Sequence, residues 1–490
     1  MNKPIRTIAV FCLLLFVALM ANATYLQFWA AGDYNKDPNN RRIIEAAFSR
    51  ERGAILVGRD PVAESVPSDD EYQFQRQYPS PLAYAHLTGF FSFYTQTALE
   101  QSQNEVLSGE DPRLFVTRLV DLLSNEGNQG GNVELTIDPA AQEAAYTALR
   151  DQLPQGAEAS VVAIEPSTGK ILAMASIPSY DPNELASHDL QSVTDTYDRL
   201  LADDSEPLIN RAINKRLPPG STFKLVTAAA GIERLDLQAD DDVPSGPGYQ
   251  LPQTSGDTGL IDNDGRTACD TDQVSFTTAM ANSCNTVFAR MAVEVGSEAM
   301  LEQAEAFGFN SDVFSDIRPA ATSVYPEDPN EPQVGQTGIG QFEVSATPLQ
   351  MAMVAAGIAN DGTVMRPYVV NKVQSADYQD LEQTDEEELS QAVSSSTAEE
   401  LTQLMVATVD EGTANPAAIE GVQVAGKTGT AQSGIDDVPP YAWFTSFAPA
   451  DDPQVAVAVM IESADIPRGE IGGGSIGGPI AKAVMEAVIQ

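Results

Sequence analysis

Residues 159–174, with the sequence ASVVAIEPSTGKILAM, decide the fold class of this chain. The runs at 160–164 and 170–174 are short, apolar and rich in β-branched residues, a composition typical of buried strands. The segment EPSTG at 165–169 lies between them and supplies the proline and glycine that favour a tight turn. This stretch therefore predicts a β-hairpin near the beginning of a domain that we place at 156–490.

Strand-like runs recur near the other end of the chain, at 422–426, 442–447 and 455–461. Helix-like stretches rich in Ala or Met lie between the two groups of strands or after them, at 221–233, 276–295, 348–360 and 480–489. Strands from both ends of a domain with helices in the middle predict an antiparallel sheet with helices packed on it, an α+β fold. Two loop-like segments, 236–272 and 376–388, interrupt this order.

The motif PPGSTFKLV at 218–226 indicates a nucleophile. Its prolines and glycine stop the preceding chain, so that a helix can begin at Ser221. Ser221 and Lys224 are three residues apart and share one helix face, close enough for the amine to take the hydroxyl proton. A lysine base must be neutral, so its pKa of about 10.4 has to be lowered by burial and a nearby second cation. A capping serine beside a solvated lysine would produce the same motif, so further elements are needed.

Two such elements follow in order. Ser283-Cys284-Asn285 begins 62 residues after Ser221, and Lys427-Thr428-Gly429-Thr430 begins another 144 residues on. Ser-x-x-Lys, a Ser-x-Asn-type element and Lys-Thr-Gly together mark penicillin-binding proteins and class A β-lactamases. The lysine at position 427 is also the second cation that a neutral Lys224 requires.

The sequence resembles the class B penicillin-binding proteins, and most closely the actinobacterial penicillin-binding protein A group. The resemblance covers nearly the whole chain. Beyond the three elements it rests on Arg52-Gly53-x-Ile55, Tyr78-Pro79 through Gly89-Phe90, residues 165–169, Asn210-Arg211, Gly340-Gln341 and Thr347-Pro348-Leu349. Cys284 departs from the family pattern, at a position that varies and contributes mostly its backbone.

This resemblance implies a peptidoglycan D,D-transpeptidase that cross-links stem peptides ending in D-Ala-D-Ala and is acylated by β-lactams, with a role in division. Ser221 would attack the penultimate D-alanine carbonyl, with Lys224 as its base. Ser283 would relay a proton to the departing D-alanine, and Asn285 would hold Lys224 and the substrate amide.

The resemblance assigns substrate binding to Thr428, Gly429 and Thr430. Together with Lys427, the two threonines would bind the terminal carboxylate of the stem, while the backbone N–H groups of Ser221 and Thr430 would hold the oxyanion. The expected fold is a serine transpeptidase/β-lactamase-like domain preceded by a smaller mixed α/β pedestal.

The first 31 residues have the pattern of a segment that enters a membrane. Lys3 and Arg6 precede an apolar run at 8–21, and aromatic residues through Trp29 extend it to the length of a bilayer span, about 20 residues. The tripeptide Ala-Asn-Ala that ends the run also suits signal-peptide cleavage. We favour a retained single-pass anchor, and both interpretations place the body of the chain outside the cytoplasm.

The expected organisation is therefore an anchor at 1–31, a pedestal of the dimerisation type at 32–155 and a transpeptidase domain at 156–490. Proteins of division or cell-wall synthesis are expected partners.

Several alternative functions remain open. A D,D-carboxypeptidase would differ only in letting water attack the acyl-enzyme, and a catalytically silent division scaffold could dispense with Lys224 or Lys427. A β-lactamase and a bifunctional synthase are disfavoured, because a deacylating Glu-x-x-x-Asn element and a glycosyltransferase domain are not found.

The composition of the chain limits which partners and ligands it can bind. Lys and Arg number 27 against 70 Asp and Glu, a formal charge of −43, which excludes nucleic acid as a partner. Two histidines, His86 and His188, are too few for a multi-histidine metal centre. The segment DNDG at 262–265 weakly resembles a calcium loop, but position 260 is a leucine where such a loop needs a ligand. We expect neither metal nor cofactor. Cys269 and Cys284 could form a disulfide, which their spacing alone does not decide.

Overall fold

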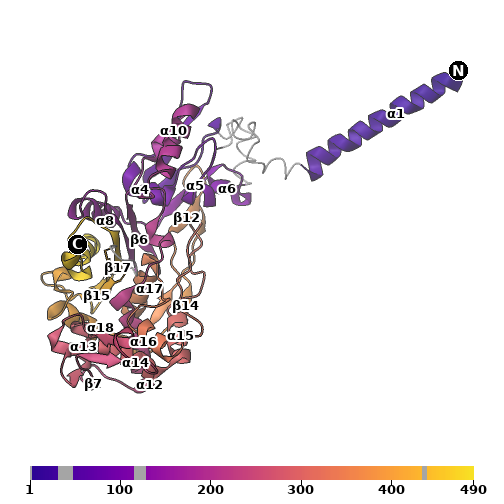
Figure 1. The fold of residues 1–490 in the computed structure, drawn as a ribbon. Coiled ribbons are helices and arrows are strands. Elements are labelled where there is room, and N and C mark those ends of the chain that lie inside the picture. The colour runs from indigo at the N-terminus through magenta and orange to yellow at the C-terminus, as the bar shows by residue number, and fades with distance from the viewer. Residues whose placement is uncertain (1–2, 31–47, 115–128, 433–438, 490) are drawn as a thin grey trace.

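The computed structural model describes residues 3–30, 48–114, 129–432 and 439–489, and its central element is an antiparallel sheet of five strands. The strand order is β15-β16-β17-β5-β6 (Figure 1). These strands are β5 (Glu158–Ile164), β6 (Ile171–Ile177), β15 (Ala425–Ala431), β16 (Tyr441–Ala448) and β17 (Val455–Ser463). The predicted hairpin is β5–β6, and the strands from the far end of the chain complete the sheet, so the α+β class is confirmed.

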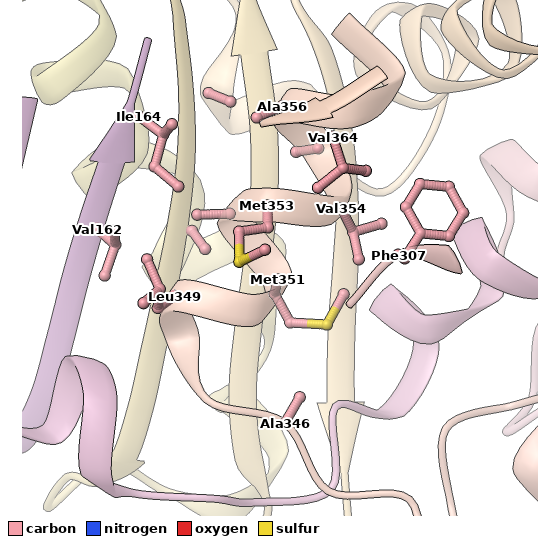
Figure 2. Packing of buried hydrophobic residues seen from close by; sticks show 14 of the residues in the cluster. Val162, Ile164, Phe307, Ala346, Leu349, Met351, Met353, Val354, Ala356 and Val364 are labelled. Atoms are coloured by element: carbon pink, nitrogen blue, oxygen red, sulfur yellow. The ribbon is translucent and has the colours of Figure 1, made fainter. Parts of the chain in front are cut away.

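Both faces of this sheet are covered, which explains why its strands are continuously apolar instead of alternating. Val161 and Ala163 of β5 pack in one cluster with α8 (Pro139–Gln152) and α19 (Gly478–Ile489). Val162 and Ile164 point to the opposite face, where α17 (Pro348–Ala359) supplies Leu349, Met351 and Met353 (Figure 2).

Six helices between residues 224 and 410 gather at the end of the molecule opposite α4 and α10 (Figure 1). They are α12 (Lys224–Leu235), α13 (Phe276–Ala281), α14 (Asn285–Val295), α15 (Ser297–Ala306), α16 (Glu331–Thr337) and α18 (Ser395–Asp410). The expected single helix at 276–295 is wrong, because the chain breaks between α13 and α14. Ser283 adopts a left-handed conformation there, with φ of +57°. A residue with positive φ cannot continue a right-handed helix.

The pedestal contributes four strands to a second sheet, with the order β13-β12-β4-β1-β2-β3. Its members are β1 (Ile55–Val57), β2 (Asp60–Pro67), β3 (Phe74–Gln77), β4 (Asn132–Leu135), β12 (Val370–Gln374) and β13 (Asp380–Gln383). The expectation of a loop over 376–388 is therefore wrong in part. The acidic segment pairs with β12 as an edge strand, where its charged side chains can remain in water.

The two parts of the chain are thus joined by a shared sheet, since β12 and β13 lie within the catalytic region in sequence and pair with pedestal strands in space. In addition, α8 lies before the expected boundary at 155/156 and yet packs on β6 and α19. One core cluster accordingly includes Ile55 of the pedestal and Phe223 of the catalytic region.

Short elements complete the described chain. The helices are α4 (Pro81–Thr88), α5 (Ala98–Ser102), α6 (Asn104–Leu107), α9 (Pro182–Leu185), α10 (Leu190–Leu201) and α11 (Arg211–Asn214). The strands are β7 (Asp242–Pro244), β8 (Gly248–Gln250), β9 (Leu260–Asp262), β10 (Gln273–Ser275), β11 (Thr363–Met365) and β14 (Glu388–Gln391). Within 236–272, where a loop was expected, β8 pairs with β9, and β7 pairs with β10, which begins just after that range.

At the N-terminus, α1 (Lys3–Thr24) and η1 (Tyr25–Trp29) form one apolar helical segment. It has 27 residues and a mean hydropathy of 2.3 in its most apolar window, and none of that window is buried. At 1.5 Å per residue such a helix exceeds the roughly 30 Å of a bilayer core. The segment is therefore long and apolar enough to cross a membrane.

Candidate active site

Ser221 lies on a turn that two close backbone contacts hold in place. The turn is η3 (Gly220–Phe223), which leads directly into α12. Gly220 has φ of +53° and donates its N–H to the carbonyl of Gly340 at 3.0 Å. A Cβ atom added to Gly340 would lie 2.1 Å from the carbonyl oxygen of Gly220, so only glycine permits this approach.

The serine lines a cleft of about 760 Å³. The cleft is lined by Ser221, Leu260, Ile261, Asp262, Asp264, Arg266, Asn285, Gln336, Ile339, Gln341, Phe342, Thr430, Gln432, Pro440, Arg468 and Ile471. They come from η3, from β9 and the turn after it, from the start of α14, from α16 and the segment that follows it, from β15 and the residues next to its end and before β16, and from the segment 468–471. A cleft of this size with convergent polar groups is suited to an extended small substrate.

Lys224 is fully buried behind the cleft, and its amine is directed at the Ser-x-Asn element. Its Nζ atom donates to Oδ1 of Asn285 at 2.6 Å, to the carbonyl of Ser283 at 2.8 Å and to Oγ of Ser283 at 3.2 Å. Among the hydrogen bonds between described residues, none joins Lys224 to Ser221 Oγ. In a free enzyme such catalytic contacts are often long and tighten when substrate binds.

The second lysine meets the first at one hydroxyl group. Lys427 is also fully buried, and its Nζ atom donates to Oγ of Ser283 at 2.9 Å and to the carbonyl of Thr428 at 3.0 Å. Ser283 Oγ is therefore shared by two lysines. The left-handed conformation of Ser283, which splits the expected helix, places this hydroxyl group where both amines can reach it.

The environment of the two lysines favours their neutral forms. Burial, the charge of Lys427 and the charge of Arg266 together hold the pKa of Lys224 well below its ordinary value, against an opposing effect of Asp264. Burial and Arg266 likewise lower the pKa of Lys427 well below its ordinary value. This is the condition that a lysine base requires.

The Lys-Thr-Gly element runs along the edge strand β15. Gly429 passes so close to the Ser221 turn that an added Cβ would lie 2.8 Å from the carbonyl oxygen of Pro219. Thr430 lines the cleft, and Thr428 Oγ1 lies 2.7 Å from Thr413 Oγ1. The strand thus presents its backbone and its threonine side chains alongside Ser221.

All eight residues predicted for the site are thereby brought to one place, in a cleft wall and the buried layer behind it. They are Ser221, Lys224, Ser283, Asn285, Lys427, Thr428, Gly429 and Thr430. Sequence reasoning missed Asp262, Asp264 and Arg266, which line the cleft. The segment DNDG has only a weak likeness to a calcium loop, and no spacing rule connects it with Asn285. The structure also joins Cys269 to Cys284 by a disulfide, which the sequence had left open.

Comparison with known families agrees with this geometry. Residues 159–486 match the family model described as the penicillin binding protein transpeptidase domain. Residues 52–133 match the penicillin binding protein A dimerisation domain. The chain therefore belongs to the penicillin-binding protein transpeptidase family.

Particular relatives share the full length of the chain. It is 42% identical to peptidoglycan D,D-transpeptidase PbpA of Mycolicibacterium smegmatis, over 100% of this chain and 99% of that protein. It is 41% identical to PbpA of Mycobacterium tuberculosis, over the same shares of the two chains. A solved structure of M. tuberculosis penicillin-binding protein A as a ceftriaxone acyl-enzyme has a TM-score of 0.84 and 40% identity, and covers 91% of this chain and 100% of its own.

Proposed function

We propose that this chain is a serine-type peptidoglycan D,D-transpeptidase in which Ser221 forms the acyl-enzyme. The observation that carries this function is the convergence of two buried lysines on Ser283 Oγ beside the cleft that holds Ser221. An ordinary capping serine has no need of two buried amines, which are costly to desolvate. Full-length similarity to D,D-transpeptidases supports the same reaction.

In the acylation step, neutral Lys224 takes the proton of Ser221, and Oγ attacks the penultimate D-alanine carbonyl of a stem peptide. The negative charge that develops on the carbonyl oxygen is held by the backbone N–H groups of Ser221 and Thr430. One donor of this kind typically lowers the barrier by about 3 to 4 kcal/mol. Ser221 is held in the cleft lining because the contacts of Gly220 and Gly340 fix its turn.

The leaving group needs a proton, and the hydroxyl shared by the lysines supplies a route. After acylation begins, Lys224 carries the proton from Ser221, and Ser283 Oγ lies 3.2 Å from Lys224 Nζ and 2.9 Å from Lys427 Nζ. Ser283 gives its hydroxyl proton to the departing D-alanine amine and takes the proton of Lys224 in its place, so that Lys224 is neutral again. Lys427, Thr428 and Thr430 bind the terminal carboxylate at short range, which outweighs the distant, screened field of an acidic protein.

A β-lactam enters the same chemistry, because its strained amide occupies the position of the D-alanyl bond and its carboxylate that of the stem. Solved relatives carry ceftriaxone, imipenem or penicillin G as acyl-enzymes. The ester formed with a β-lactam persists when no positioned water attacks it.

The second half-reaction decides between transpeptidase and carboxypeptidase. An amine of a neighbouring stem must react faster than water, which is present at ~55 M, and a well-oriented acceptor reaches effective molarities of 10⁵ M or more, as an order of magnitude. The test supplies a donor thioester with and without a D-amino-acid acceptor, and with Ser221→Ala as control. Mainly cross-linked product supports the proposal. Dominant hydrolysis with lipid-linked substrate and multimeric acceptor strands present would replace it with the carboxypeptidase.

The placement of the enzyme follows from its N-terminal segment. The helix Lys3–Trp29 anchors the chain as a single pass, with the positively charged Lys3 and Arg6 inside and the catalytic domain outside. The pedestal raises the cleft away from the bilayer and offers a surface to proteins of division or cell-wall synthesis. Protease protection in right-side-out vesicles tests the topology, since an exposed body is digested and a cytoplasmic one is not.

A further inference from the structure

The cleft wall beside Asn285 is formed by a tight turn at 262–266 that carries an ion pair. Asp262 accepts the N–H of Asp264 at 2.9 Å, and Asp264 has φ of +50°. Arg266 donates through Nη1 to Asp264 Oδ2 at 3.1 Å and to the carbonyl of Asn263 at 3.1 Å. Both charged side chains line the cleft that contains Ser221.

This turn is fastened to the start of α14 on both sides of Asn285. Asn263 is buried, donates to the carbonyl of Gly246 at 2.8 Å and accepts the N–H of Thr286 at 3.1 Å. Cys284, the residue before Asn285, is joined by the disulfide to Cys269, shortly after the turn. The turn is therefore tied directly to the Ser-x-Asn element.

The contacts of Asn285 give this attachment a consequence for the reaction. Its Nδ2 atom donates one hydrogen bond to the carbonyl of Asp262 and one to Oδ2 of Asp264, both at 3.0 Å. A flipped amide would turn its oxygen towards two other oxygens. The amide oxygen must therefore face Lys224, which lies 2.6 Å away.

We propose that Asp264 and Arg266 are positioning residues for acylation: Asp264 fixes the Asn285 amide towards Lys224, and Arg266, which donates to the same Asp264, places a positive charge near the two buried lysines. The inference rests on the proposed role of Lys224 as base. It assigns a task to a turn that lies outside the three catalytic elements.

The charges of Asp264 and Arg266 shift the pKa of Lys224 in opposite directions. The groups that face Lys224 are Lys427 and Arg266, which lower its pKa along with burial, and Asp264, which raises it. Arg266 also lowers the pKa of Lys427, after burial. Removing Asp264's charge therefore lowers the pKa of Lys224 further, and removing Arg266 raises it. A purely structural role would not produce effects of opposite sign.

The test measures the acylation rate of the full chain by penicillin G against pH in three variants. Asp264→Asn keeps the shape of the side chain and an acceptor oxygen, so the maximal acylation rate is retained. The acid limb, where the rate falls as Lys224 becomes protonated, moves to lower pH because the pKa of Lys224 is lower. Arg266→Gln moves the acid limb to higher pH. On that limb we expect rate changes of about two- to fivefold, the range for partly exposed charge pairs, which shrink at high salt. Asp264→Ala removes one of the two acceptors of Asn285 Nδ2, so the amide is held less firmly and the maximal rate falls, whereas Asp264→Asn restores it.

Asp312→Asn is the matched control, since Asp312 forms an exposed ion pair with Arg318 at 2.7 Å and does not line the cleft. Its profile should coincide with that of the wild type. Acid limbs that stay in place or move together, or an Asp264→Ala variant with the full maximal rate, would overturn the inference while leaving a Ser221 adduct intact. A wild-type chain that forms no adduct on Ser221 would overturn the proposed function and the inference with it.

Discussion

The Nζ atom of Lys224 lies 2.6 Å from Oδ1 of Asn285, so the buried base is held by a neutral amide. An amide oxygen satisfies the amine without adding negative charge, which keeps the pKa of Lys224 depressed by burial and by Lys427. A carboxylate in the same place would also accept a hydrogen bond from the lysine, but its negative charge would favour the ammonium form. Asparagine at this position therefore both orients Lys224 and leaves its pKa low.

Asn285→Asp should uncouple these two roles. The new carboxylate favours the ammonium form and raises the pKa of Lys224, so less neutral base is present at pH 7 and the acid limb of the acylation profile moves to higher pH. Stopped-flow acylation by a chromogenic β-lactam across pH measures this shift. An unchanged limb with a uniformly lower rate would mean that Asn285 acts through geometry alone.

Lys224→Arg should be nearly as damaging as Lys224→Ala. A guanidinium remains protonated at any relevant pH and cannot accept the Ser221 proton. Loss of a general base typically lowers the rate about 10²- to 10⁴-fold. Acylation rate constants of the two variants are compared under identical conditions, and an arginine variant close to the wild-type rate would make Lys224 an electrostatic residue only.

The sequence predicted the parts of the molecule that depend on local pattern. The β5–β6 hairpin follows from two apolar runs around EPSTG, and Ser221, Lys224 and Lys427 follow from motifs whose chemistry requires one another. Their spacing in the chain is large, but each motif is short and self-contained. This is why the motifs could be recognised from a single sequence.

The parts of the fold and the site that the sequence did not predict depend on contacts between residues far apart in the chain, which local sequence patterns do not indicate. The acidic stretch at 376–388 looks like a loop, yet pairing with β12 makes Asp380–Gln383 a strand. The stretch 276–295 looks like one helix, yet the left-handed Ser283 divides it. Asp264 acquires a role only because the turn at 262–266 folds against Asn285. Tertiary packing overrides local propensity in each case.

Gly340→Ala should abolish most acylation, because the added Cβ would lie 2.1 Å from the carbonyl oxygen of Gly220 and push the Ser221 turn out of place. Gly58→Ala is the matched control: Gly58 has φ of +61°, close to the +69° of Gly340, but its Cβ would meet nothing within 4 Å. Both variants lose about 1 kcal/mol of stability to backbone strain. Equal acylation rates in the two would show that the close approach is unimportant.

Removing the disulfide should destabilise the fold as well as the turn. Cys269 and Cys284 are separated by 15 residues, and a bridge closing a loop of that size contributes about 3 kcal/mol by restricting the unfolded chain. Cys269→Ala combined with Cys284→Ala should therefore lower the free energy of unfolding by up to that amount in denaturant titrations. A variant as stable as the oxidised wild type would indicate that the bridge does not constrain the unfolded state.

The decisive residue is Ser221, and intact-mass spectrometry after incubation with penicillin G tests it most directly. We predict a stable mass increase equal to one β-lactam, which peptide digestion maps to the segment that contains Ser221. The reason is that Ser221 lines a cleft next to Lys224 and Lys427, whose pKa values are both lowered well below the ordinary value. Ser221→Ala, folded and otherwise unchanged, should show no increase. An unmodified wild-type protein, or an adduct on any other residue, would contradict the assignment of Ser221 as the nucleophile.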